Sequence, residues 1–133
     1  MVFAGEPEHR ELLKRIFVGK KYVEMTSEEA EMVKYAHNVF GALKVTYFNC
    51  IYDLCQKLGM DYERVRQGIL GSTYINEMHT KVPGPDGKLG YGGKCFPKDV
   101  NAFAKMTAGT PLGTLLEHLH ELNVHFRGFE EHI

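Results

Sequence analysis

The chain has 133 residues, a length that accommodates one domain, or one domain with part of another. A hydrophobic fraction of 44% suffices for a core, and 16 Lys and Arg against 17 Asp and Glu leave a formal net charge of -1. This balance argues against nucleic acid or a membrane surface as a partner, and the sequence contains neither a membrane-spanning apolar run nor a signal-peptide pattern.

The first 26 residues predict a small β-α-β segment. Strands are expected at Val2–Gly5 and Tyr22–Thr26, with a helix over Pro7–Phe17 between them. Such a segment is too small to bury a parallel sheet by itself. We therefore interpret residues 1–26 as the edge of a larger α/β domain.

One long helix dominates the pattern that follows. Thr26 and Glu29 have the spacing of a capping box, and apolar residues then recur every three or four positions up to Gly59. The helix should contain about 30 residues and measure about 45 Å. Because its apolar positions extend most of the way round, it needs burial on more than one side, and we expect a homodimer partner to cover part of it.

The rest of the chain predicts further helices around a long loop. Asp61 is a good N-cap for a helix over Tyr62–Leu70. The connection Ser72–Gly93 is rich in Gly and Pro, and loops of this length are usually functional or disordered. Another helix is expected from about Pro97 to Met106.

The last helix is expected to begin at a capping-box pair, Thr114 and Glu117, and to continue through Phe126. The predicted fold is therefore mainly α. It is a helical dimerisation domain over residues 27–133, built on one long central helix and preceded by a small β-α-β remnant of an α/β domain.

The stretch Gly90–Asp99 carries the strongest chemical signal. Its glycines form a flexible approach loop, which ends at the start of a helix where Cys95 sits. The helix dipole and the flanking Lys94 and Lys98 favour the nucleophilic thiolate. Asp99 lies four residues further on, within reach of a group bonded to Cys95. The plainer alternative is that Cys95 is a small buried apolar residue.

Lys34 and Asn38 are four residues apart on the long helix and so share one face. An ammonium and an amide N–H could together stabilise an oxyanion that develops near a nucleophile. Taken alone, the pair is more simply read as a solvated lysine and a locally bonded asparagine.

The remaining cysteines and the histidines give no metal site. Cys50 and Cys55 are five residues apart, as are His120 and His125, so each pair diverges on a helix and fits neither zinc nor a disulfide. An odd, sparse set of three cysteines that includes Cys95 indicates free thiols in a reducing compartment, with cytoplasm as the default.

Two stretches resemble one family. Gly90–Asp99 closely resembles the active-site signature of the UDP-glucose/GDP-mannose dehydrogenase family, and Ala30–Asn38 resembles the start of its central helix. The resemblance implies that residues 1–26 end an NAD-binding α/β domain, and that residues 27–133 form the all-helical central domain, which is the dimer core in that family.

The family's activity is a four-electron oxidation, in which the C6 alcohol of a sugar nucleotide becomes a carboxylate and two NAD are reduced. The resemblance implies that Cys95 is the nucleophile that holds the intermediate as thiohemiacetal and then thioester. It implies that Lys34 and Asn38 stabilise charge and hold the attacking water, and that Asp99 assists proton transfer.

The same resemblance assigns Tyr91, Gly92 and Gly93 to the loop that packs on the sugar nucleotide, and Lys98 to the cofactor-facing end of the signature. UDP-glucose is the commonest substrate of the family. GDP-mannose, UDP-N-acetylmannosamine and related sugars remain open.

The chain departs from the family in what it lacks. It has no glycine-rich NAD-binding half, no substrate-contacting glutamates from that half and no C-terminal domain, and an arginine common in the family is replaced near Tyr74. We expect the isolated chain not to turn over, and NAD to be bound mainly by a domain absent from it. Two alternatives stay open: a non-catalytic dimerisation module, and an unrelated cysteine hydrolase with His79 as base.

Overall fold

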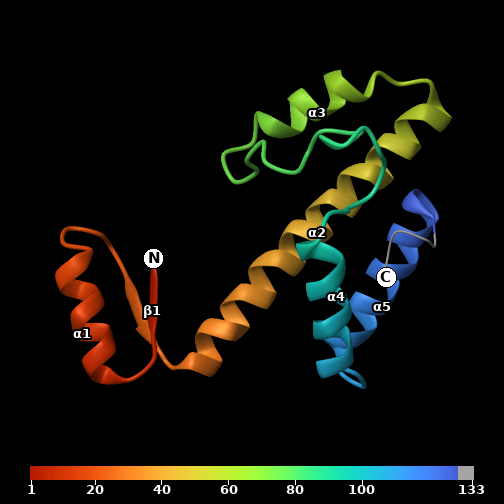
Figure 1. The fold of residues 1–133 in the computed structure, drawn as a ribbon. Helices are drawn as coiled ribbons and strands as arrows, with labels where there is room; N and C mark the ends of the chain where they lie inside the picture. The colour runs from red at the N-terminus through yellow and green to blue at the C-terminus, as the bar shows by residue number, and fades with distance from the viewer. Residues whose placement is uncertain (129–133) are drawn as a thin grey trace. The chain divides into compact units, whose positions relative to one another are not determined.

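The computed structural model describes residues 1–128, and the chain divides into two compact units, Met1–His37 and Asn38–Ile133. The described part is mainly α-helical, which confirms the predicted fold class (Figure 1). Its elements are, in chain order, β1 (Val2–Ala4), α1 (Pro7–Ile16), β2 (Val23–Met25), α2 (Ser27–Leu58), α3 (Tyr62–Leu70), α4 (Cys95–Met106) and α5 (Pro111–Arg127). No helix within this part is both long enough and apolar enough to cross a membrane.

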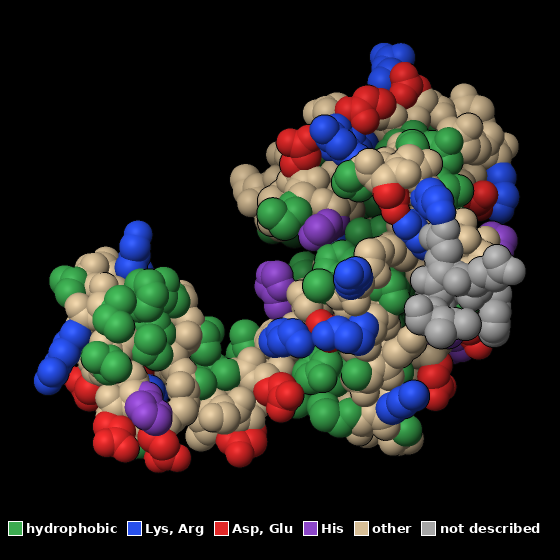
Figure 2. Space-filling view, viewed as in Figure 1, with side chains coloured by type: hydrophobic (Ala, Val, Ile, Leu, Met, Phe, Trp, Pro, Cys, Tyr) green, Lys and Arg blue, Asp and Glu red, His purple; other side chains and the backbone are tan. Residues whose placement is uncertain are grey.

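The first unit contains the predicted β-α-β segment. Strands β1 and β2 pair in parallel, with Val2 opposite Val23, and α1 connects them. Phe3 is the buried residue of this unit, and its ring stacks on that of Tyr22 with the centroids 4.8 Å apart. Hydrophobic side chains nevertheless gather on one face of the unit (Figure 2), and Val18 is 80% exposed. Parallel strands normally have both sheet faces covered by other elements. This two-stranded sheet has an uncovered apolar face, as expected of the edge of a larger sheet.

Helix α2 begins at the predicted capping box. The backbone N–H of Thr26 donates to Glu29 Oε2 at 2.7 Å, and the N–H of Glu29 donates to Thr26 Oγ1 at 3.2 Å. The helix continues for 32 residues and ends before Gly59, whose φ of 65° is left-handed and favours glycine. The start, the length and the end therefore agree with the sequence prediction.

Within the second unit, α2 is apolar on more sides than the chain covers. Its inward residues are packed against the rest of the unit, and they include Val39, Ala42, Phe48 and Cys55. Phe40, Tyr47 and Leu54 are instead 67%, 55% and 50% exposed. These three residues are seven positions apart and lie along one side of the helix. We refer to them as the exposed α2 stripe.

Helix α3 packs against the C-terminal half of α2. Asp61 is its N-cap, as predicted, since Oδ1 accepts a hydrogen bond from the N–H of Arg64 at 3.2 Å. Phe48, Cys55 and Tyr62 form the centre of the apolar cluster between these elements.

One predicted helix start is confirmed and one is wrong. Helix α4 begins at Cys95, two residues before the approximate bound at Pro97 and at the residue that the motif placed at the helix start, so the thiol belongs to the first turn. Helix α5 begins at Pro111 rather than at the Thr114–Glu117 pair, because Thr110 Oγ1 caps it by accepting from the N–H of Gly113 at 3.2 Å. Proline at the first helical position favours this earlier start. Helices α4 and α5 then pack side by side (Figure 1).

Candidate active site

Cys95 is the first residue of α4, and its side chain is exposed. Gly93, two residues earlier, has a φ of 75°, a left-handed conformation that turns the loop into the helix and is accessible mainly to glycine. The thiol therefore lies among the unpaired backbone N–H groups of a helix N-terminus. The alternative of a buried apolar cysteine is wrong for Cys95, although it describes Cys55, which is 3% exposed.

The structure brings Asn38 and Asp99 together. Asn38 Nδ2 donates to Asp99 Oδ2 at 2.6 Å, although the two residues are 61 positions apart. Asp99 is 1% exposed and lies one turn into α4, near Cys95. Lys98 Nζ is 3.3 Å from Asp99 Oδ1, while the lysine side chain remains 65% exposed. A buried carboxylate thus has an amide and an ammonium beside it, which stabilise its charge.

Lys34 belongs to the first unit, since the division falls between His37 and Asn38. It lies on α2 one turn before Asn38, and its Nζ is 5.2 Å from the centre of the Tyr35 ring. Its action on a group bound to Cys95 therefore stays a prediction, as do the roles of the other predicted catalytic residues.

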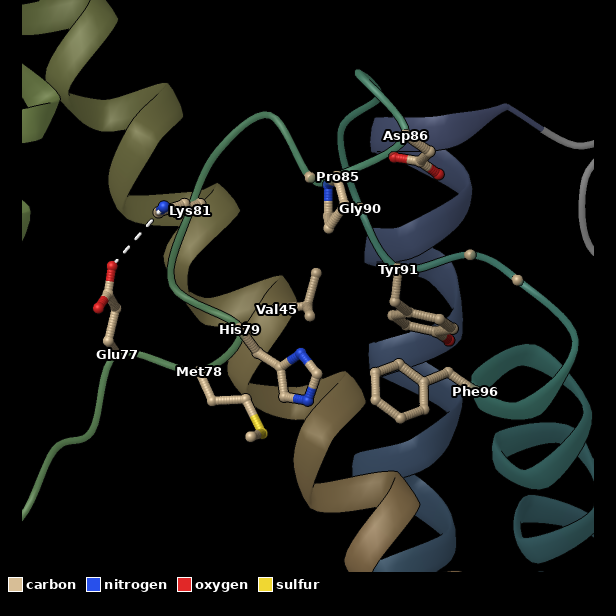
Figure 3. A pocket seen from close by; sticks show the side chains of 13 residues that line it. Val45, Glu77, Met78, His79, Lys81, Pro85, Asp86, Gly90, Tyr91 and Phe96 are labelled. Carbon is tan, nitrogen blue, oxygen red and sulfur yellow. Dashed lines mark ion pairs between the residues drawn. The ribbon is translucent and has the colours of Figure 1, made fainter.

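A pocket of about 670 Å³ opens beside this helix start (Figure 3). The three residues predicted to contact the sugar nucleotide, Tyr91, Gly92 and Gly93, all line it. Cys95 is not among the lining residues but lies between two that are, Gly93 and Phe96. The pocket therefore borders the residues on either side of Cys95 in the chain.

Two aromatic rings of this pocket, those of Phe96 and His79, were not predicted from the sequence to line a substrate site. The Phe96 ring lies against α2 at Gly41, where a Cβ atom would be only 2.6 Å from the ring. His79 packs edge-on against Phe96 with the ring centroids 5.3 Å apart, and both rings point into the pocket in Figure 3. His79 has a φ of 65°, which is uncommon for a residue other than glycine. Phe96 belongs to the Gly90–Asp99 motif, which is a signal that could have identified it. No local sequence pattern indicated that His79 lines the pocket.

The long loop before the motif is anchored rather than detached. Lys44 Nζ donates to the carbonyl oxygen and to Oδ1 of Asn76, at 2.6 and 2.8 Å. Tyr62 Oη donates to the carbonyl oxygen of Thr80 at 2.6 Å, and Arg66 Nη1 donates to Thr80 Oγ1 at 3.0 Å. Helices α2 and α3 therefore hold the first half of the loop.

Burial keeps the pocket's tyrosine protonated to a higher pH than that of an exposed phenol. It raises the pKa of Tyr91 to about 12, and the hydroxyl has no hydrogen-bond partner among residues 1–128. The phenol is therefore protonated at neutral pH and cannot act as a base there. On the loop nearby, the guanidinium of Arg127 lowers the pKa of Asp86.

A thiol at a helix N-terminus, an amide-bonded carboxylate one turn away and an adjacent pocket suit covalent chemistry on a carbonyl carbon. Residues 28–125 match the central domain of the UDP-glucose/GDP-mannose dehydrogenase family, and the chain belongs to this family.

Curated relatives are UDP-glucose 6-dehydrogenases. YwqF of Bacillus subtilis is 42% identical over 77 residues, which are 58% of this chain and 16% of YwqF. TuaD of the same organism is 37% identical over 98 residues, 72% of this chain and 20% of TuaD. The enzyme of Rickettsia felis is 33% identical over 112 residues, 77% of this chain and 23% of that enzyme. The chain thus spans about a fifth of the length of these relatives.

Proposed function

We propose that this chain is the central domain of an NAD-dependent sugar-nucleotide 6-dehydrogenase in which Cys95 is the nucleophile. The observation that carries the proposal is the placement of an exposed thiol at the start of α4, one turn from a carboxylate that Asn38 holds at 2.6 Å. The names of the relatives support UDP-glucose as the substrate.

In the proposed reaction the C6 alcohol first becomes an aldehyde by losing a hydride and its hydroxyl proton. The Cys95 thiolate then attacks the carbonyl carbon of this aldehyde, and a C–S bond forms as the carbonyl π electrons move to oxygen. Asn38 and Lys34 stabilise the resulting oxyanion with an N–H donor and a positive charge. Loss of hydride from this thiohemiacetal gives a thioester. Water then attacks the thioester carbon, the C–S bond breaks, and the acid and the thiol are released, with Asp99 assisting proton transfer.

NAD would supply the hydride acceptor for both oxidation steps. Among residues 1–128, the feature that fits such a group is the exposed ammonium of Lys98, beside Asp99 at 3.3 Å. A single cation can contact a dinucleotide but cannot hold its pyrophosphate as a glycine-rich helix N-terminus does. We therefore assign cofactor binding mainly to residues outside this chain, with Lys98 as a peripheral contact, and expect the isolated chain to be inactive.

We assign the pocket beside Cys95 to part of the sugar nucleotide. Gly92 and Gly93 offer partly or fully exposed backbone, and the rings of His79 and Phe96 line the pocket together with the 2% exposed Tyr91. This combination suits a polar ligand with a flat base. UDP-glucose is preferred over GDP-mannose on the strength of the relatives alone.

The proposed domain boundary after residue 26 differs from the division between the compact units, which falls between His37 and Asn38 inside α2. Residues 1–26 would end an NAD-binding α/β domain, because their parallel strands leave apolar side chains uncovered. Residues 27–133 would form the central dimerisation domain. Free thiols at Cys50, Cys55 and Cys95 support a reducing compartment such as the cytoplasm.

The exposed α2 stripe favours a second copy of this chain as partner, since large apolar residues along one helix side are normally covered. This feature is equally compatible with a non-catalytic dimerisation module derived from the family. That second candidate differs from the first only in having no use for Cys95, Asn38 and Asp99.

A chimera separates the two candidates. Residues 28–125 replace the matching segment of TuaD, and NADH formation is followed with UDP-glucose. We expect oxidation by the chimera and no acid formation after Cys95→Ser, with Cys50→Ser as the control thiol. A folded but inactive chimera would support the dimerisation module, and acid formation by Cys95→Ser at the unchanged rate would refute the assignment of the nucleophile.

A further inference from the structure

The loop that enters α4 is held by a buried asparagine on α5. Asn123 is 0% exposed, and its Oδ1 accepts a hydrogen bond from the backbone N–H of Tyr91 at 2.7 Å. Its Nδ2 donates to the carbonyl oxygen of the same residue at 3.0 Å. One side chain thus pairs with both backbone polar groups of Tyr91, as a neighbouring strand would. On the other side, Asn49 Oδ1 on α2 accepts from the N–H of Gly90 at 2.9 Å.

Two glycines of the motif leave the space that these side-chain contacts require. A Cβ atom on Gly90 would collide with Asn123 Oδ1, and one on Gly92 would collide with the guanidinium of Arg127. Arg127 Nη1 also donates to the carbonyl oxygens of Leu89 and Gly90, at 3.0 and 3.2 Å. Gly90 and Gly92 thus allow close approach of side chains from α5. The predicted contact of Gly92 with the sugar nucleotide stays a prediction.

Aromatic packing connects Tyr91 to the residue that follows Cys95. The Tyr91 ring lies edge-on to Phe96 with the centroids 6.5 Å apart. Phe96 directly follows Cys95 and is confined on its other side by Gly41 of α2. The backbone position of Tyr91 therefore influences where the first turn of α4 can lie.

Packing of the buried face of α5 does not by itself require an amide at position 123. Leu116 and Leu119, on the same helix, are buried with 0% and 3% exposure. A buried amide without partners is unfavourable relative to such a leucine, so the amide of Asn123 is best explained by the loop that it binds.

We propose that Asn123 is a positioning residue, which fixes the Gly90–Tyr91 backbone and through it the start of α4 that carries Cys95. The catalytic consequence of this placement rests on the proposed function of Cys95. The placement itself does not.

The test is amide hydrogen exchange of the full 133-residue chain, compared between the wild type, Asn123→Ala and the matched control Leu119→Ala. We expect Asn123→Ala to accelerate exchange at Gly90 and Tyr91 by about tenfold or more relative to the amides of α2. Leu119→Ala should affect the loop and the helices alike, because it removes packing without removing a hydrogen bond to the loop. Unchanged loop exchange in Asn123→Ala, or acceleration by the same factor throughout, would overturn the proposal.

If Asn123→Ala does not fold, Asn123→Leu decides the question. It fills the space of the side chain while removing both hydrogen bonds to Tyr91, and the proposal requires acceleration confined to the same loop. Uniform or absent acceleration in Asn123→Leu would then overturn it.

Alkylation of Cys95 by iodoacetamide gives the second readout. We expect it to slow in Asn123→Ala and not in Leu119→Ala, because a frayed first turn withdraws its backbone N–H groups from the thiolate. An equal rate in wild type and Asn123→Ala would overturn the link between the loop and the thiol. A Cys95 that is no more reactive than Cys50 in the wild type would instead count against the proposed function, while the exchange data would still decide the role of Asn123.

Discussion

Asn38 on α2 donates its side-chain N–H to Asp99 on α4 at 2.6 Å, which joins the long helix to the first turns of the helix that Cys95 begins. Asp99 is 1% exposed, so the bond acts on a carboxylate that water barely reaches. In such surroundings a hydrogen bond to a charged group is stronger than at the surface, and its loss is correspondingly costly. The pair therefore has both a structural and a proposed chemical role.

We predict that Asn38→Ala lowers the free energy of unfolding by about 1–3 kcal/mol, because it leaves a buried carboxylate without its amide donor. The double variant with Asp99→Ala should cost less than the sum of the two single changes. Urea denaturation of the four proteins measures this coupling. Strict additivity would mean that the bond contributes nothing of its own.

Cys95 should be the reactive thiol of the chain. It is exposed at a helix N-terminus, whereas Cys55 is buried, and burial raises the pKa of the half-buried Cys50. We expect iodoacetamide to modify Cys95 at least about tenfold faster than either of the others, as followed by peptide mass spectrometry. Cys95→Ser should abolish the fast phase and Cys50→Ser should leave it intact. Equal rates at Cys50 and Cys95 would contradict this expectation.

Two buried tyrosines provide a matched comparison. The Tyr62 hydroxyl donates to the Thr80 carbonyl oxygen at 2.6 Å, whereas that of Tyr91 has no partner among residues 1–128. Tyr62→Phe should therefore cost about 0.5–1.5 kcal/mol, while Tyr91→Phe should be neutral or stabilising. Thermal or urea unfolding at neutral pH measures both. A marked loss of stability in Tyr91→Phe would show that its hydroxyl is paired in solution.

Tyr91 also predicts that the stability of the fold decreases at alkaline pH. Burial raises the pKa of Tyr91 to about 12 in the folded chain, above the value of about 10 for an unperturbed phenol. The unfolded chain then loses this proton first, so the contribution of Tyr91 to stability is complete below about pH 10 and is lost between about pH 10 and 12. Tyr91→Phe should lose less stability than the wild type over this range. Parallel pH profiles for the two proteins would disprove the assignment.

The exposed α2 stripe predicts self-association. Phe40, Tyr47 and Leu54 are all at least 50% exposed, and a second copy would bury them. We expect a dimer in sedimentation equilibrium at micromolar concentration, and a monomer after Tyr47→Glu. Gln56→Glu adds the same charge about half a turn away from Tyr47 around the helix and should leave the dimer intact. A stable monomeric wild type would refute the prediction.

Local chemistry in the sequence determined much of the fold. The capping box of Thr26 and Glu29 and the unbroken apolar recurrence specify α2 from its first turn to Gly59, and Asp61 specifies α3. These signals depend on residues within one or two helical turns, so they can be read without knowledge of the tertiary structure. The motif around Cys95 was recognisable for the same reason.

The tertiary structure alone decided what holds that motif in place. Asn123 and Asn49 contact the loop across separations of 32 and 41 residues, which no periodicity records. In the sequence, a buried amide such as that of Asn123 is only a polar residue within an apolar helix pattern. Its hydrogen-bond partners are unpaired backbone groups that only folding brings beside it.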